Sequence, residues 1–401
     1  MAKDLLETVD SRILGARLRH AREMRGWTQQ KVADEMDLAR TTVVAIEKGE
    51  RRLRPAEIVH LAQLFERQVS ELLQGSQPSE GFAVQLRDEL RPSALIDADL
   101  LPHIEEFERL CEDYKQLEDL CHAPLRRRYP IPYDMRGTDA EIAAVDAAST
   151  ERRRLDLGDG PLLKLREILE SDVGLRIFQL ELPSAVAGMF SFTESLGGCI
   201  AVNLRHPVER RRQSLAHEYG HFLTRRSQPE IIYLGRYERR PASERFSEAF
   251  ARSFLMPADG LRRRYLELLR EREGSPTHGD LCRLAHFYVV SVEAMTRRLE
   301  ELRLVPAGVW DRLQLEGFKV EEARQLLGLE PAVTEDGTLP HRFVALAVEA
   351  WQRAELSEGQ LARYLRTDRL RTRDTIDLLR RSQGSEPSGA IDLSAPLLNV
   401  V

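Results

Sequence analysis

The sequence predicts a mainly α-helical protein with a small β-sheet, an α+β architecture divided among several domains. Ala, Leu, Arg and Glu dominate the composition, and aromatic residues make up only 6% of it, a balance that favours helices. Closely spaced helical patterns fill residues 11–73, and helical patterns dominate again from about 207 to 303. Between them, residues 175–180 and 199–203 have the composition of short strands. A chain of 401 residues has room for two or three such domains.

Charge and hydropathy limit the classes of protein to which this chain can belong. A net charge of -6 argues against a surface coated in nucleic acid over its whole length, although a local basic patch can still bind DNA. No segment approaches the roughly 20 apolar residues of a membrane helix, and no apolar region of a secretory signal follows the N-terminus. The four cysteines form no Cys-x-x-Cys pair, so we expect ordinary thiols in a cytoplasmic protein.

The beginning of the chain has the pattern of a helix-turn-helix, which we expect to form a domain over residues 1–73. Thr28 is a good N-cap for a short helix with an apolar face. After a tight turn, residues 40–47 are expected to form a second short helix. Two helices joined in this way present the start of the second helix to the major groove of DNA.

This pattern resembles the Xre family of helix-turn-helix repressors, which implies a five-helix type of domain and a double-stranded DNA operator. By that resemblance, the leading residues of the second short helix read base edges, and nearby basic side chains contact the backbone. The implied DNA contacts are Gln29, Arg40, Thr41, Thr42, Lys48, Arg51 and Arg52. We also expect a homodimer, because paired half-sites favour two-fold symmetry. The alternative is a helix-turn-helix used only for protein contacts, because Glu47 and Glu50 dilute its basic charge.

Residues 74–137 are predicted to connect this domain to the next one. They begin with a polar linker at 74–81, and a long amphipathic helix follows around 98–128. The apolar stripe of this helix consists of Leu100, Ile104, Phe107, Cys111, Tyr114 and Cys121. The stripe can pack within the chain or pair with a second copy of itself, and packing within the chain is the simpler interpretation.

The segment from His217 to His221 has the spacing of a catalytic metal site. On a helix, residues four apart share a face, so the two imidazoles can bind one metal ion. Glu218 can then accept a proton from metal-bound water, whose pKa zinc lowers to about 7. The motif lies within a predicted helix and follows a predicted strand, as such a site requires.

A third ligand is expected further along the chain, where Glu244 and Glu248 are again four residues apart. One of them can bind the metal while the other accepts a hydrogen bond from a ligating histidine. Two histidines and a carboxylate make Zn2+ the default ion, although Mn2+ or Fe2+ can use the same ligands. Tyr233 and Tyr237 are weaker candidates for a hydrogen bond to an oxyanion.

Together these segments resemble the ImmA/IrrE family of metallopeptidases, and we expect a zincin-like domain over residues 138–305. The resemblance implies His217, His221 and Glu244 as metal ligands and Glu218 as the general base. Glu248 stands where the family has Asn or Asp, so an exchange of roles between Glu244 and Glu248 stays open. The implied activity is that of a zinc-dependent endopeptidase that cleaves a repressor-type regulatory protein in a stress or mobile-element response.

Two other functions are compatible with these motifs. A non-hydrolytic DNA-binding regulator or antitoxin would use the metallopeptidase-like domain as a sensor, or as a binding module for a neighbouring gene product. A general-purpose zinc peptidase with an incidental DNA-binding module is the weaker alternative. The presence of Glu218 favours hydrolysis, because a domain retained only for binding has no need of a general base.

Residues 306–401 are predicted to be a helical C-terminal region with a loose tail from Ser382. Ser357 and Gln360 form a capping box within a helical pattern near 340–382, and residues 281–302 have a similar helix-turn-helix rhythm. Either segment can contact DNA, but a helical packing element is the simpler interpretation.

Overall fold

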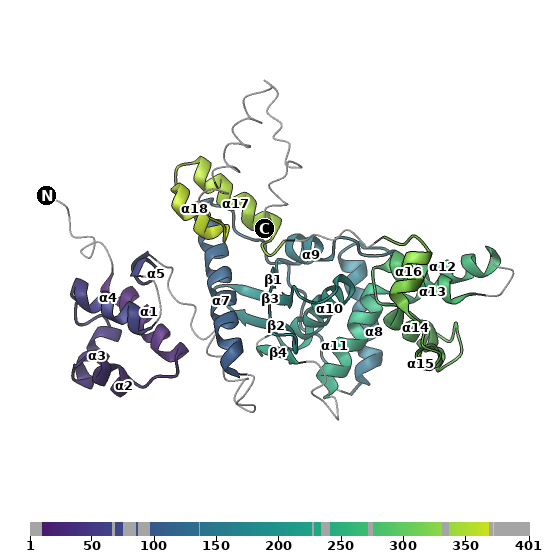
Figure 1. Cartoon of the computed structure of the whole chain (residues 1–401), viewed down its shortest axis with the longest axis horizontal. Coiled ribbons are helices and arrows are strands. Elements are labelled where there is room, and N and C mark those ends of the chain that lie inside the picture. Colours follow the sequence, from purple (N-terminus) through teal and green to yellow (C-terminus); the bar gives the residue numbers. More distant parts are fainter. Residues whose placement is uncertain are drawn as a thin grey trace, which may run out of the picture. The chain divides into compact units, whose positions relative to one another are not determined.

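The computed structural model describes residues 10–65, 69–74, 86, 97–135, 137–226, 228–233, 241–271, 276–330, 337–368 and 372. The chain divides into two units, residues 1–116 with 193–196, and residues 117–192 with 197–401. Helices predominate in both units and a small sheet lies in the second, so the predicted fold class is confirmed (Figure 1). Within the described ranges, we find no helix that combines the length and the apolarity needed to cross a bilayer.

The N-terminal unit contains short helices packed around one apolar core. These helices are α1 (Ser11–Met24), α2 (Gln29–Glu35), α3 (Arg40–Glu47), α4 (Pro55–Leu64) and α5 (Val69–Gln74). Thr28 caps α2, because its hydroxyl accepts a hydrogen bond from the N–H of Lys31 at 3.1 Å. The turn into α3 is tight because Asp37 adopts a positive φ of 52°. The predicted bounds of α3 agree with its observed bounds.

α7 (Asp97–Leu120) carries the predicted apolar stripe as far as Tyr114, and Cys121 directly follows the helix. All of the stripe residues are buried. The helix ends earlier than the predicted position near residue 128. The reason is local: His122 adopts a positive φ of 51°, and Pro124 cannot donate the backbone hydrogen bond that a longer helix needs. The predicted linker at 74–81 lies almost entirely outside the described residues.

The described strands form a four-stranded sheet in the second unit, in the order β1-β3-β2-β4. Its strands are β1 (Arg176–Leu180), β2 (Val186–Thr193), β3 (Gly197–Asn203) and β4 (Glu230–Tyr233). β1 and β3 are parallel, with Ile177 opposite Ile200, and β2 and β4 are antiparallel, with Met189 opposite Ile231. The sequence predicted β1 and β3 but not β2 or β4.

Helices of the second unit pack on this sheet and on one another. They are α8 (Ala140–Arg154), α9 (Leu165–Ile168), the π-helix η2 (Leu169–Val173), α10 (Val208–Arg225), α11 (Ala242–Leu255), α12 (Ala258–Glu271), α13 (His278–Tyr288), α14 (Val292–Glu301), α15 (Val309–Leu315), α16 (Val320–Leu326), α17 (His341–Gln352) and α18 (Glu358–Tyr364). α10 packs on β3, α11 packs on α10, and α8 packs on α11 (Figure 1). The core therefore lies around α10 and α11.

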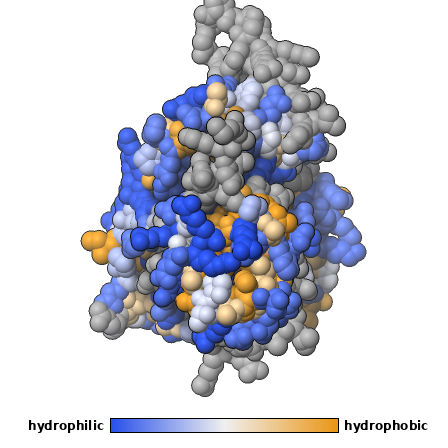
Figure 2. Space-filling model, turned by 90° about the vertical axis from the view of Figure 1, so that its left-hand side faces the viewer, coloured by the Kyte–Doolittle hydropathy of each residue, from blue (hydrophilic) through white to orange (hydrophobic). Residues whose placement is uncertain are grey.

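The hydrophilic character of the surface agrees with the high content of charged residues in the sequence. Hydrophilic residues cover much of the face shown in Figure 2, with smaller hydrophobic areas between them. All four cysteines, by contrast, are buried as free thiols, as expected for ordinary core residues.

Candidate metal centre

α10 brings the two histidines of the motif together on one face. His217 and His221 lie one helical turn apart, and their Nε2 atoms are 2.9 Å from each other. His221 is buried, whereas His217 keeps 14% of its side chain exposed. The two Nε2 atoms therefore converge on one point at the edge of the core. This point is accessible to solvent on the side of His217.

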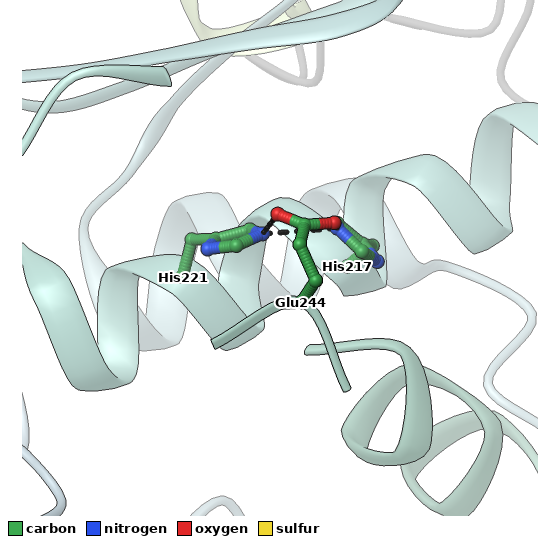
Figure 3. Close-up of side chains that lie close together, drawn as sticks. All are labelled: His217, His221 and Glu244. Atoms are coloured by element: carbon green, nitrogen blue, oxygen red, sulfur yellow. Dashed lines mark hydrogen bonds and ion pairs between the residues drawn. The ribbon is translucent and has the colours of Figure 1, made fainter. Parts of the chain in front are cut away.

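Glu244 approaches this point from the first turn of α11. Its Oε1 lies 3.2 Å from Nε2 of His221, and its Oε2 lies 3.5 Å from Nε2 of His217. The three side chains come from two helices and point toward one another (Figure 3). One ligand atom from each residue falls within a group whose members are at most 4.8 Å apart.

The spacing of these atoms fits a tetrahedral metal ion. With zinc-to-ligand distances of about 2.0–2.1 Å, neighbouring ligand atoms stand roughly 3.4 Å apart. The two imidazole nitrogens stand 2.9 Å apart, and each lies near a different oxygen of Glu244, at 3.2 and 3.5 Å, so all three distances are close to that value. Two imidazole nitrogens and one carboxylate oxygen are also a donor set that zinc favours. These residues therefore form a possible metal site with three protein ligands.

Glu218 follows His217 on α10, and its side chain is fully buried. Gly188 on β2 leaves room for it: a Cβ at this position would stand 2.9 Å from Oε1 of Glu218. A glycine inside a strand indicates a close approach by another group, and here that group is the candidate general base. Gly188 is thus a site residue that the sequence analysis missed, although its place within a strand was a usable signal.

Close packing of α10 on α11 holds the ligands in register. A Cβ at Gly220 would lie 2.9 Å from the Cα of Ser247, so a larger residue would push the two helices apart. Ser247 is itself buried. Glycine between the two histidines and a small residue at 247 therefore allow His221 and Glu244 to meet.

A buried polar network fixes α10 against α8. The hydroxyl of Tyr219 donates to Glu151 at 2.5 Å, and Arg154 donates to both of these residues. Glu151 is fully buried, and its ion pair with Arg154 measures 2.7 Å. Burial and the adjacent carboxylate hold the pKa of Tyr219 well above its usual value. Sequence spacing gave no sign of this network, because Tyr219 lies 68 residues from Glu151 along the chain.

Glu248 lies one turn beyond Glu244 on α11, outside the group of three ligand atoms. Its carboxylate is 3.7 Å from Arg252, and 34% of its side chain is exposed. The geometry therefore favours Glu244 over Glu248 as the third ligand. Tyr237 lies outside the described residues, as does the side chain of Tyr233.

The first turn of α3 carries the predicted base-reading residues of the N-terminal unit. Arg40 and Thr41 are exposed and Thr42 is half-buried, while Val43 and Ile46 turn into the core. Two more of the predicted DNA contacts are exposed, namely Lys48 and Arg52. The start of α3 is thus accessible, as a recognition helix requires.

Gln29 and Arg51, the remaining predicted DNA contacts, have partners inside the unit. Gln29 donates its amide to Glu47 at 2.9 Å, and Arg22 binds the same carboxylate at 2.6 Å. These three residues join α1, α2 and α3. Arg51 pairs with Glu57 at 2.8 Å and lowers the pKa of that carboxyl. Both predicted contacts therefore also have a structural role.

Comparisons with known protein families match two separate segments of the chain, one for each motif. A family model described as a helix-turn-helix domain matches residues 13–75, and one described as an IrrE N-terminal-like domain matches residues 170–300. The second match includes the three candidate ligands and Glu218. No curated protein matches the chain. Among solved structures, the chain matches the crystal structure of ComR from Streptococcus suis with 13% sequence identity and a TM-score of 0.16. The match covers 93% of this chain and 90% of the ComR chain.

These two matches confirm the two family resemblances, and the chain is a DNA-binding regulator with a protease-like domain: a helix-turn-helix domain fused to a domain of the ImmA/IrrE type.

Proposed function

We propose that the second domain is a zinc-dependent endopeptidase that cleaves a repressor-type regulatory protein in a stress or mobile-element response. The observation that carries this proposal is the convergence of His217, His221 and Glu244, with the buried Glu218 next to His217 on the same helix. Three protein ligands leave a position open for water or substrate, whereas a structural zinc site would have four. The ligands therefore suit catalysis.

The chemistry assigned to this site is hydrolysis of a peptide bond. Zinc would supply Lewis acidity, which polarises the peptide carbonyl and makes water a better nucleophile at neutral pH. Glu218 follows the first ligand and would accept the proton of the attacking water, then return it to the leaving amine. Because this carboxylate is fully buried, its electrostatic effect on the reacting groups is screened little by solvent.

The helix-turn-helix suggests where this peptidase would act. A protease fused to a DNA-binding domain is delivered to an operator, where its repressor substrate is also concentrated. We propose that the chain binds paired half-sites as a homodimer, because exposed recognition helices in such domains usually act in two-fold pairs. Cleavage of a regulator at that place would change transcription directly.

A survey of new protein N-termini in cells that express the full chain tests this function. Wild type is compared with Glu218→Gln, which keeps the size of the side chain but removes the base, with and without DNA damage. Glu248→Gln is the matched control, because it makes the same chemical change on a partly exposed residue outside the ligand group. We expect a new terminus within a repressor-type protein in wild type and Glu248→Gln only.

The same survey distinguishes the alternative. Identical termini in all three samples would contradict the peptidase. If Glu218→Gln then also retained a stable stoichiometric complex with a neighbouring gene product, the domain would be a binding module of a non-hydrolytic regulator or antitoxin.

A further inference from the structure

The second unit contains a cavity of about 330 Å³ away from the candidate metal centre. It lies between the end of α8, the end of α11 and the start of α12, and α14 contributes Arg298 to its wall. Ser253 lines it from α11, roughly 13 Å along that helix from Glu244. A volume of this size is typical of a site for a small molecule. We therefore examined which groups the cavity offers to a ligand.

Arg152, in the last turn of α8, shapes one wall of the cavity. Its side chain is buried, and all of its hydrogen bonds go to backbone carbonyls. The guanidinium donates to Gly158 at 2.8 Å, to Gly160 at 2.6 Å and to Phe254 at 2.5 Å. These bonds tie the loop after α8 to the end of α11. The wall is therefore held by a buried cation.

The charge of Arg152 has no carboxylate partner. Among the residues that the structure describes, none forms an ion pair with it, and its hydrogen bonds satisfy its donors without adding a negative charge. Burial lowers the pKa of Arg152 to about 10, even though Tyr288 and Asp159 act in the opposite direction. A cation that has lost water without gaining a paired anion makes its surroundings electropositive. An anion in the cavity would compensate this charge.

Arg298 supplies a second cation with donors to spare. Only 2% of its side chain is exposed. Its Nε donates to the carbonyl of Met256 at 3.2 Å, and its Nη1 lies 2.9 Å from Oε1 of Glu301. No acceptor for its Nη2 occurs among the described residues, and the side chain lines the cavity. A guanidinium with a free Nη2 can donate two hydrogen bonds to an oxyanion.

Two further donors lie along the same cavity. Ser253 is 4% exposed, and its hydroxyl has no partner within the described part of the chain. The cavity also borders the start of α12 at Ala258. The first helical hydrogen bond there runs from Leu261 to Pro257 at 3.0 Å, so the N–H groups before it are outside the helical ladder. The N-terminal end of a helix attracts anions, which agrees with the two buried cations.

The acidic residues of the cavity lie nearer to solvent than the cations. Asp159 is already paired with Arg263, at 2.7 and 2.8 Å. Asp156 is exposed, and the side chain of Asp259 is 89% exposed. Carboxylates at such a rim accept hydrogen bonds from hydroxyl groups. The cavity thus combines an electropositive interior with acceptors at its mouth.

We propose that this cavity binds a small phosphate monoester of a hydroxylated molecule, such as a sugar phosphate or a nucleotide. Arg298 and Ser253 hold the phosphate group, while the carboxylates of Asp156 and Asp259 accept from hydroxyls of the ligand. The exposed Arg153, which also lines the cavity, adds a cation at the mouth. Binding at this place involves no ligand of the metal centre, so it is independent of the proposed peptidase.

Calorimetric titration of the full chain at about 150 mM salt tests this proposal. The probes are ribose 5-phosphate and adenosine 5′-monophosphate, compared with inorganic phosphate and with ribose. We expect at least one ester to bind with a Kd below about 1 mM, inorganic phosphate to bind more weakly, and ribose not to bind. The tighter of the two esters shows whether the ligand is a sugar phosphate or a nucleotide.

Substitutions locate the binding. Arg298→Gln should weaken ester binding at least about tenfold, because it removes a charged donor from the interior. Arg153→Gln should weaken it at least about threefold, and this exposed position keeps the test valid if Arg298→Gln lowers the melting temperature. Arg262→Gln on α12 is the matched control, since half of its side chain is exposed and it does not line the cavity. It should leave the affinity unchanged.

Three results would overturn the proposal. The first is the absence of saturable binding by either ester, or binding of ribose with the same affinity. The second is ester binding that Arg298→Gln and Arg153→Gln both leave unchanged, which would place the ligand on the helix-turn-helix domain or at the metal centre. The third is equal affinity for inorganic phosphate and both esters, because the rim would then recognise nothing.

Discussion

Tyr219 lies within the His-Glu-x-x-His segment, yet its hydroxyl points away from the candidate ligands and forms a hydrogen bond with α8. It donates to Glu151, a carboxylate without solvent exposure, which Arg154 neutralises. A buried charge is tolerated only when it is paired and hydrogen-bonded. The contact therefore keeps α10, and with it the two candidate histidine ligands, against α8.

Replacing Tyr219 by Phe removes this hydrogen bond without changing the ring. We expect the free energy of unfolding to fall by about 1–3 kcal/mol, because Glu151 loses a donor while it stays buried. Tyr265→Phe on α12 is the matched control: this ring is also buried, but no described residue hydrogen-bonds its hydroxyl. Denaturant unfolding of both variants measures the difference. Equal stability of the two variants would show that the network contributes nothing.

The tyrosines around Glu151 also predict how stability depends on pH. Burial, and then the charge of Glu151, raises the pKa of Tyr133 from 10.0 to about 12. A phenol with a raised pKa holds its proton more tightly in the folded state than in the unfolded state. Its stabilisation is therefore complete below pH 10 and is lost as the pH rises toward about 12. Unfolding measured across this window should be less steeply dependent on pH in Tyr133→Phe than in wild type, and an identical dependence would contradict this.

At the scale of single residues, spacing was enough to predict which histidines meet but not which carboxylate joins them. Residues 217 and 221 share a helix, so their convergence follows from helical geometry alone. Glu244 and Glu248 also share a helix face, and the choice between them depends on how α11 crosses α10. That crossing is a tertiary property, set by contacts such as the one between Gly220 and Ser247.

At the scale of elements, the crossing of α10 and α11 determines the metal centre. Helices pack at a distance set by the side chains at their contact point. Here the contact point is a glycine on α10 facing the backbone of α11. The ligands of the two helices meet because this distance is short.

Gly220→Ala should therefore destabilise the protein, although alanine is the better helix former. We expect a loss of about 1–3 kcal/mol, because the added methyl would overlap the Cα of Ser247. Gly279→Ala on α13 is the matched control, since its nearest neighbour is a flexible leucine side chain at 3.4 Å. It should be neutral or slightly stabilising. Thermal unfolding of the two variants checks the expectation, and equal melting temperatures would contradict the close crossing.

The strands show where prediction from composition stops. β1 and β3 are short apolar runs, and their prediction is confirmed. β2 was missed although it is mostly buried, because Gly188 interrupts its pattern. β4 has only four residues, too few to show a period. Edge pairing with β2, rather than its own sequence pattern, makes β4 a strand.

At the scale of the whole molecule, one chain combines a helix-turn-helix domain with a protease-like domain. The order of the domains could be predicted from the motifs, because each motif is local in sequence. Their boundaries stay predictions, and so does the set of DNA contacts. Spacing could not predict that Gln29 and Arg51 bind carboxylates within the domain, since Glu47 and Glu57 come from other elements.

DNA binding by the N-terminal domain should depend on Arg40, which is exposed at the start of α3. Once an operator has been selected from random duplexes, Arg40→Ala should weaken binding by about 1–3 kcal/mol and relax preference at one base position. Arg12→Ala on α1 is a control with the same charge change on another exposed arginine. Competition binding at fixed salt measures both variants, and equal affinities would remove Arg40 from the set of base contacts.

The zinc content of the purified full chain is the most direct measurement of the central claim, that His217, His221 and Glu244 form one metal centre. Wild type is compared with Glu244→Gln and with Glu248→Gln, which makes the same change one turn away on the same helix. We expect about one zinc ion per chain in wild type and Glu248→Gln, and little in Glu244→Gln, because three protein ligands are needed to hold the ion. Zinc retained by Glu244→Gln and lost from Glu248→Gln would contradict this geometry, and absence of zinc from all three proteins would contradict the zinc centre itself.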